Sequence, residues 1–90
     1  QSLRMVEIRR VVASGRADEH MQLEVQTAAK TSNKRSYRVS MHLLLAKIYV
    51  QRGFGDAARG ELEDIAALKA NTQDIREARK MLEDMKKREA

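Results

Sequence analysis

Few residues of this chain have side chains that could perform catalysis or bind a metal. The chain has no cysteine and only two histidines, His20 and His42. A zinc site or a nucleophilic centre needs several such groups at fixed spacing, but neither histidine has a second one four residues away, and no serine lies in a nucleophile motif. We therefore expect both histidines to be structural, with no catalytic residue, no metal site and no cofactor.

Two other patterns resemble ligand sites but lack essential parts. In the acidic stretch that contains Glu61, Glu63 and Asp64, the first and last share a helix face and the middle one does not, which favours a solvated surface. The three glycines between residues 53 and 60 are not a phosphate-binding loop, because no strand precedes them and no lysine follows in place. Neither pattern therefore predicts a metal site or a phosphate site.

The composition favours helices. The 90 residues include no proline, four glycines and 34% charged residues, mostly Lys, Arg and Glu, which keep rotamer freedom in a helix. Leu, Ile, Val, Met and Ala must supply most of the core, because only Tyr37, Tyr49 and Phe54 are aromatic. A chain of this length buries about 60–65% of its unfolded surface. We predict an all-α fold with one modest core and a single domain, 1–90.

Apolar residues at spacings of three and four predict five short helices, which should stack as antiparallel hairpins. The first should span residues 3–13, the second should run from a cap at Asp18 to about Lys30, and the third should span 36–52. A turn at Gly53 and a cap at Asp56 should begin the fourth.

The last two predicted helices are separated by a break at Asn71-Thr72. In the fifth, Ile75, Ala78, Leu82 and Met85 have the spacing of a coiled-coil seam. This helix should therefore either cap the open end of the stack or pair with a second copy of the chain. The third helix is apolar at seven of the eight positions 43–50, so we expect it to be covered from more than one side.

A run of large and small apolar residues carries a family resemblance: Leu45, Ala46, Tyr49, Gly53, Ala58 and Leu62. This run, within residues 39–70, resembles a tetratricopeptide repeat. The resemblance implies about two and a half repeats that bind another protein. It also implies close helix contacts at Ala46 and Ala58, with Leu45, Tyr49 and Leu62 packed around them.

Two further similarities bear on the origin of the chain. Residues 11–15 with Asp18 align with residues 49–53 and Asp56 at an offset of 38, which suggests a diverged first hairpin. Residues 45–62 and 73–82 are also loosely similar to the C-terminal domain of the bacterial pilus-assembly protein FimV. Since the chain begins with Gln1, we expect a segment of a longer protein.

The repeat resemblance implies a partner-binding groove on the third helix. The matching positions are Ser40, Leu43, Lys47, Val50 and Gln51. Their mixture of apolar residues with one cation suits a mixed or helical peptide. The alternative is that Leu43 and Val50 are ordinary core residues, because a nearly all-apolar helix in a small domain is often central.

The charge distribution supports a different hypothesis. Of the net charge of +5, the first 45 residues contribute four, since they hold eight Lys and Arg against four acids. Lys30, Lys34, Arg35 and Arg38 flank the predicted loop 31–33 and could contact nucleic acid or an acidic partner. The alternative is a solvated face, because acids are mixed in and only Tyr37 is an aromatic neighbour.

From these observations we expect a non-catalytic protein-interaction or assembly scaffold module. The basic nucleic-acid or acidic-partner module is one alternative, and a helical assembly subunit or secretion chaperone is another. No apolar run approaches the ~20 residues that span a bilayer, so membrane insertion by this segment is not expected. The compartment is left open, with the cytoplasm as the default.

Overall fold

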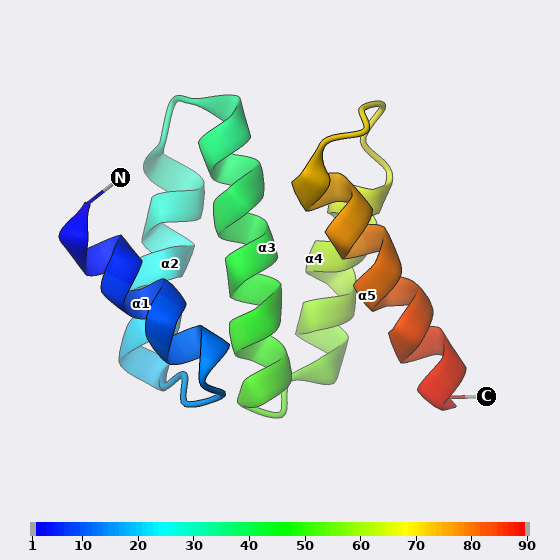
Figure 1. The fold of residues 1–90 in the computed structure, drawn as a ribbon, viewed down its shortest axis with the longest axis horizontal. Helices are drawn as coiled ribbons and strands as arrows, with labels where there is room; N and C mark the ends of the chain where they lie inside the picture. Colours follow the sequence, from blue (N-terminus) through cyan, green and yellow to red (C-terminus); the bar gives the residue numbers. More distant parts are fainter. Residues whose placement is uncertain (1, 90) are drawn as a thin grey trace.

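Helix α3, Arg35–Gln51, stands at the centre of the molecule (Figure 1). It packs against α2, Glu19–Thr31, and α4, Gly55–Ala66, while α1, Leu3–Ala13, and α5, Gln73–Glu89, lie in front of these two helices and flank α3. Consecutive helices run in opposite directions. The computed structural model describes residues 2–89, which contain five helices and no strand, so the all-α prediction is confirmed.

The start of α2 has a side-chain cap, whereas the starts of α3 and α4 have none. Asp18 caps α2 as predicted, because its carboxylate accepts a hydrogen bond from the Met21 amide at 3.0 Å. The predicted cap at Asp56 is wrong: α4 begins at Gly55 after Phe54, without a side-chain cap. Asp56 lies inside the first turn, where its charge still complements the positive end of the helix dipole.

The turns that end α1 and α3 have the same backbone geometry. Gly15 and Gly53 both adopt left-handed conformations, with φ of +77° and +82°. The amide of the residue after each glycine donates to a carbonyl four residues before the glycine, at 3.2 Å in the first turn and 2.8 Å in the second. Both are Schellman-type helix ends. The alignment at an offset of 38 therefore has a counterpart in backbone hydrogen bonds.

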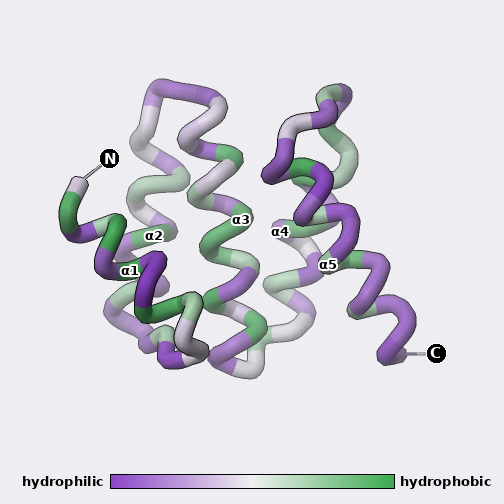
Figure 2. Tube along the Cα trace, viewed as in Figure 1, coloured by the Kyte–Doolittle hydropathy of each residue, from purple (hydrophilic) through white to green (hydrophobic). Residues whose placement is uncertain are grey.

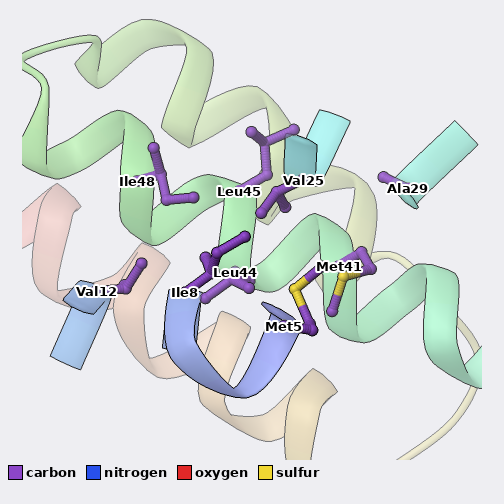
Figure 3. Close-up of a cluster of buried hydrophobic side chains, with 9 residues drawn as sticks. All are labelled: Met5, Ile8, Val12, Val25, Ala29, Met41, Leu44, Leu45 and Ile48. Carbon is purple, nitrogen blue, oxygen red and sulfur yellow. The ribbon is translucent and has the colours of Figure 1, made fainter. Parts of the chain in front are cut away.

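The apolar residues form two cores, one on each side of α3, so the expectation of one core is wrong. The first core joins α1, α2 and α3 and contains Met5, Ile8, Val12, Val25, Ala29, Met41, Leu44, Leu45 and Ile48 (Figure 3). The second core joins α3, α4 and α5 and contains Leu43, Ala46, Leu62, Ile65, Ile75, Ala78 and Leu82. The prediction that α3 is covered from more than one side is confirmed. By contrast, α5 is largely hydrophilic (Figure 2) and buries one narrow stripe.

The residues of the repeat-like run divide between the two cores. Ala46 and Ala58 are fully buried, in agreement with close helix contact. Leu45 and Tyr49 pack in the first core, however, whereas Leu62 packs in the second. The expected single cluster around the alanines is therefore wrong, because neighbouring positions on α3 point to opposite sides of the molecule.

Candidate functional site

The five predicted groove positions on α3 do not form one open surface. Two of them face α5: the Ser40 hydroxyl donates to a carboxylate oxygen of Asp74 at 2.5 Å, and the Lys47 ammonium lies 2.7 Å from a carboxylate oxygen of Glu77. The middle of the expected groove is therefore occupied by the last helix of the chain itself.

The other three positions lie in different surroundings. Leu43 is only 3% exposed and belongs to the second core, which agrees with the alternative that Leu43 is an ordinary core residue. The Gln51 side chain accepts a hydrogen bond from the Ala17 amide at 2.9 Å and donates to the Val12 carbonyl at 2.6 Å. Gln51 is thus a structural tie between α3 and the first turn. Val50 is 43% exposed and borders a small hollow of about 330 Å³.

The four predicted basic residues also lie in different surroundings. Lys34 and Arg35 line the larger hollow described below, whereas Lys30 lies exposed on the last turn of α2. The Arg38 guanidinium donates to the Ser32 carbonyl at 2.9 Å and so holds the loop between α2 and α3. Arg38 is therefore partly committed to the fold.

A hollow of about 720 Å³ lies where α3 begins, between the α2–α3 loop and the α4–α5 loop. We call it the basic groove and define it by six lining residues: Lys34, Arg35, Val39, Leu68, Lys69 and Ile75. Ile75 is buried and the other two apolar residues are half-buried, so the groove has an apolar floor. Three cations stand around this floor.

Two of the polar residues that line the groove are hydrogen-bonded to each other. Ser40 and Asp74, the hydrogen-bonded pair between α3 and α5, line the same groove. One predicted groove residue and two predicted basic residues thus meet at a single place. Arg9 of α1 contributes a further cation to the lining. The groove therefore has four cations and one carboxylate.

The α4–α5 loop is held in place by an arginine. The Arg79 guanidinium donates to the carbonyls of Ala66, Leu68 and Ala70 at 3.2, 3.0 and 3.4 Å. Because Arg38 holds the loop on the other side of the groove, both loops that present cations are fixed by a guanidinium from the neighbouring helix.

Sequence reasoning did not identify Leu68 and Lys69, which follow Lys34 by more than 30 residues. The signal that could have found them is the alternation of helix direction. In a chain of antiparallel helices, the second and fourth connections lie at the same end of the molecule. Stretches 30–40 and 64–76 there contain six Lys and Arg and two acids.

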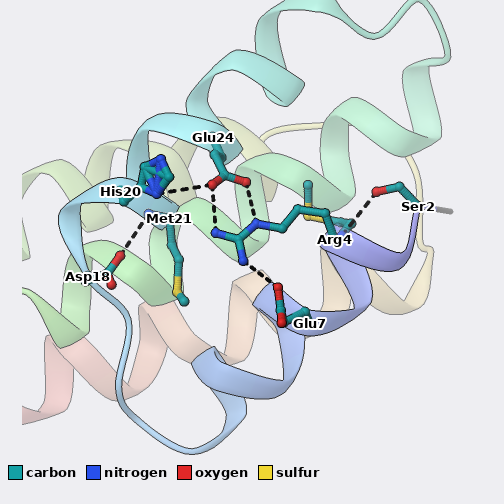
Figure 4. A network of polar contacts seen from close by, with 8 residues as sticks. Ser2, Arg4, Glu7, Asp18, His20, Met21 and Glu24 are labelled. Carbon is teal, nitrogen blue, oxygen red and sulfur yellow. Dashed lines mark hydrogen bonds and ion pairs between the residues drawn. The ribbon is translucent and has the colours of Figure 1, made fainter.

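Several cations elsewhere are paired with acids. Arg4 of α1 donates to Glu24 of α2 through two nitrogens, at 2.7 and 2.8 Å, and also to Glu7 (Figure 4). The hydrogen bonds from Arg4 hold the pKa of Glu24 below its usual value, and they raise the pKa of Arg4. Glu89 likewise raises the pKa of Arg59 by hydrogen bonding. Charge pairing thus ties helices together away from the basic groove.

The histidines lie in structural contacts. His42 Nδ1 is 2.7 Å from a carboxylate oxygen of Glu61, across the α3–α4 interface. The His20 side chain is 75% exposed and lies 3.4 Å from Glu24. Within residues 2–89, no group of three or more metal-binding side chains comes together.

Comparison of the chain with protein-family models, with curated proteins and with solved structures finds no match. No helix in the described part of the chain is long and apolar enough to cross a membrane.

Proposed function

We propose that the chain is a non-catalytic protein-interaction module that binds a peptide or helix of a partner protein in the basic groove. The observation that carries the proposal is a hollow of about 720 Å³ that combines an apolar floor with the cations Lys34, Arg35 and Lys69.

The apolar floor supports a protein partner. Val39 and Leu68 are half-buried and pack on the second core, so each leaves part of its side chain at the groove surface. An apolar side chain of a partner could cover this surface. Each Å² of apolar surface removed from water contributes about 25 cal/mol of favourable free energy. The volume of about 720 Å³ is ample for such a side chain and its flanking backbone.

The fixed loops also support binding. Arg38 and Arg79 hold the two groove loops through backbone carbonyls, so these loops are already ordered before a partner arrives. A pre-formed site loses less conformational freedom on binding than a mobile one.

The nucleic-acid alternative has weaker support. Arg38 is tied to the Ser32 carbonyl, and the only aromatic residue that lines the groove is Tyr37. Proteins that bind single-stranded nucleic acid without sequence preference combine a basic groove with aromatic side chains on which bases stack. The groove has one aromatic residue and an aliphatic floor, a combination that suits a side chain better than a base.

The test is a selection from a random peptide library displayed on phage. Selected peptides are titrated against the wild-type chain, against Leu68→Ser in the groove floor, and against Leu23→Ser as a matched control. Leu23 is a leucine that is 52% exposed on α2, outside the groove. Circular dichroism checks that each variant remains helical.

We expect binding to weaken with Leu68→Ser and to persist with Leu23→Ser. Selected peptides that bind both variants equally would place the binding surface elsewhere and refute the proposal. A library that yields no binder would refute it as well.

A further inference from the structure

We propose that the segment bound in the basic groove is acidic, with carboxylate side chains on both sides of one apolar side chain. This inference rests on the proposed function, since it names the chemistry of the partner that the same groove would bind. Its basis is the charge of three lining residues, Lys34, Arg35 and Lys69.

These three cations have no ion-pair partner within residues 2–89. The ion pairs of the described residues involve other cations, among them Arg4, Lys47 and Arg52. Lys47, for example, is neutralised by Glu77 of α5. The charges of Lys34, Arg35 and Lys69 are therefore not neutralised by a direct ion pair within residues 2–89.

The one carboxylate of the groove is already engaged. Asp74 accepts a hydrogen bond from Ser40, and its position on α5 sets it at the wall next to Ile75. Among residues 2–89, no other acid lines the groove. Lys34, Arg35 and Lys69 around an open hollow create a positive potential that attracts and orients an anionic partner.

The backbone at the start of α3 adds to this potential. The first turn of α3 contains no acidic residue, and Lys34 at the N-cap provides no side-chain hydrogen bond to the helix. The positive end of the helix dipole is therefore not neutralised locally. It reinforces the charge of Lys34 and Arg35, which belong to the same turn.

The order of charged and apolar groups defines the partner more closely. Lys34 and Arg35 come from the α2–α3 connection and the start of α3, and Lys69 comes from the α4–α5 loop. Val39 and Leu68 provide the apolar surface of the same groove. A segment that matches both features has an apolar residue with acids on either side.

The test uses three fluorescein-labelled peptides that differ only in charge or in the central residue. Their sequences are Glu-Glu-Leu-Glu-Glu, Gln-Gln-Leu-Gln-Gln and Glu-Glu-Ser-Glu-Glu, with both ends blocked. They are titrated by fluorescence anisotropy at low salt and again with added salt. A single-stranded oligonucleotide of equal charge is the fourth probe.

We expect the first peptide to bind about tenfold more tightly than the second or the third, and its affinity to fall as salt is added. Lys34→Gln and Lys69→Gln should each weaken the first peptide severalfold and leave the second unchanged. Lys86→Gln, an exposed lysine near the end of α5, is the matched control and should change neither.

Three results would overturn the inference. The first is that the glutamine peptide binds as tightly as the glutamate peptide, and the second is that only phage-selected peptides without acids bind in the groove. In either case the groove binds peptides without selecting their charge, so the further inference fails and the proposed function remains. If the oligonucleotide binds more tightly than the acidic peptide and depends on Lys34 and Lys69, the nucleic-acid alternative replaces both proposals.

Discussion

The two ends of the helix stack are built in opposite ways. At one end, which we call the turn end, stretches 14–22 and 50–61 contain three Lys and Arg and four acids. Arg52 bonds to Gln22, lies 3.6 Å from Glu19 and stacks over Phe54, while Gln51 bonds across to the first turn. At the end with the basic groove, Lys34, Arg35 and Lys69 form no ion pair within residues 2–89.

This difference indicates that the polar side chains at the turn end stabilise the fold, whereas the unpaired cations Lys34, Arg35 and Lys69 at the groove end serve binding. At the turn end, polar side chains contact other parts of the chain, and their removal should change the free energy of unfolding. At the groove end, two arginines hold loops, while the remaining cations contribute little to folding. Substitutions there should change binding more than stability. The following predictions test that separation, beginning with the largest effect.

The largest change in stability is expected at the glycine of the second turn. Gly53→Ala should lower the free energy of unfolding by about 1–2 kcal/mol, because an alanine is strained at φ +82°. Gly60, inside α4 with open space around it, is the control: Gly60→Ala should raise the free energy by about 0.5–1 kcal/mol. Urea denaturation measures both. Equal effects of the two substitutions would show that the turn end does not depend on this backbone conformation.

The next largest loss of stability is expected on substitution of Gln51. Gln51→Ala removes two hydrogen bonds to the backbone of the first turn, and we expect a loss of about 1 kcal/mol in the free energy of unfolding. Gln73→Ala, at the exposed start of α5, should change stability by less than about 0.5 kcal/mol. If Gln51→Ala is as stable as wild type in urea, Gln51 does not hold the turn end together.

At the groove end, Arg79 should affect binding more than stability. Arg79→Met releases the α4–α5 loop, and we expect a loss of about 0.5 kcal/mol or less in stability, because these bonds are exposed to water. Affinity for phage-selected peptides should nevertheless fall severalfold, since Leu68 and Lys69 lose their fixed position. Lys80→Met is the neighbouring control and should retain wild-type affinity. Unchanged affinity of Arg79→Met would mean that loop order does not matter for binding.

The smallest effect concerns the paired charges of α1 and α2. Since Arg4 lowers the pKa of Glu24 in the folded state, the stabilisation is present above the ordinary glutamate pKa and is lost as pH falls toward the folded-state pKa. Arg4→Met should raise the pKa of Glu24 and reduce the loss of stability on acidification. Carbon-detected NMR titration of the Glu24 carboxyl gives the pKa. Lys34→Met, the control, should leave it unchanged.

Local signals in the sequence predicted most of the fold. The spacing of apolar residues placed the helices, Gly15 and Gly53 placed two turns, and Asp18 placed a cap. These features depend on interactions within a few residues. Asp56 was predicted incorrectly because the Schellman turn at Gly53 puts Phe54 at the N-cap of α4, so that Asp56 already lies in the first turn.

The candidate site was less predictable because it depends on how distant segments pack. Lys34 and Arg35 were recognisable from their local charge, but Lys69 joins them only through the antiparallel order of the helices. The groove expected along α3 failed for a related reason. Leu43, Ser40 and Lys47 match the resemblance in type and spacing, yet α5 covers or pairs with them.

The position of α3 in both cores has a consequence for cooperativity. Leu43 and Leu44 are adjacent in sequence but pack in different cores. Unfolding of either core therefore removes packing contacts from α3. Local unfolding should therefore begin at the edges, in α1 or α5, while α3 remains helical. In hydrogen exchange, the amides of α3 should exchange only through global unfolding.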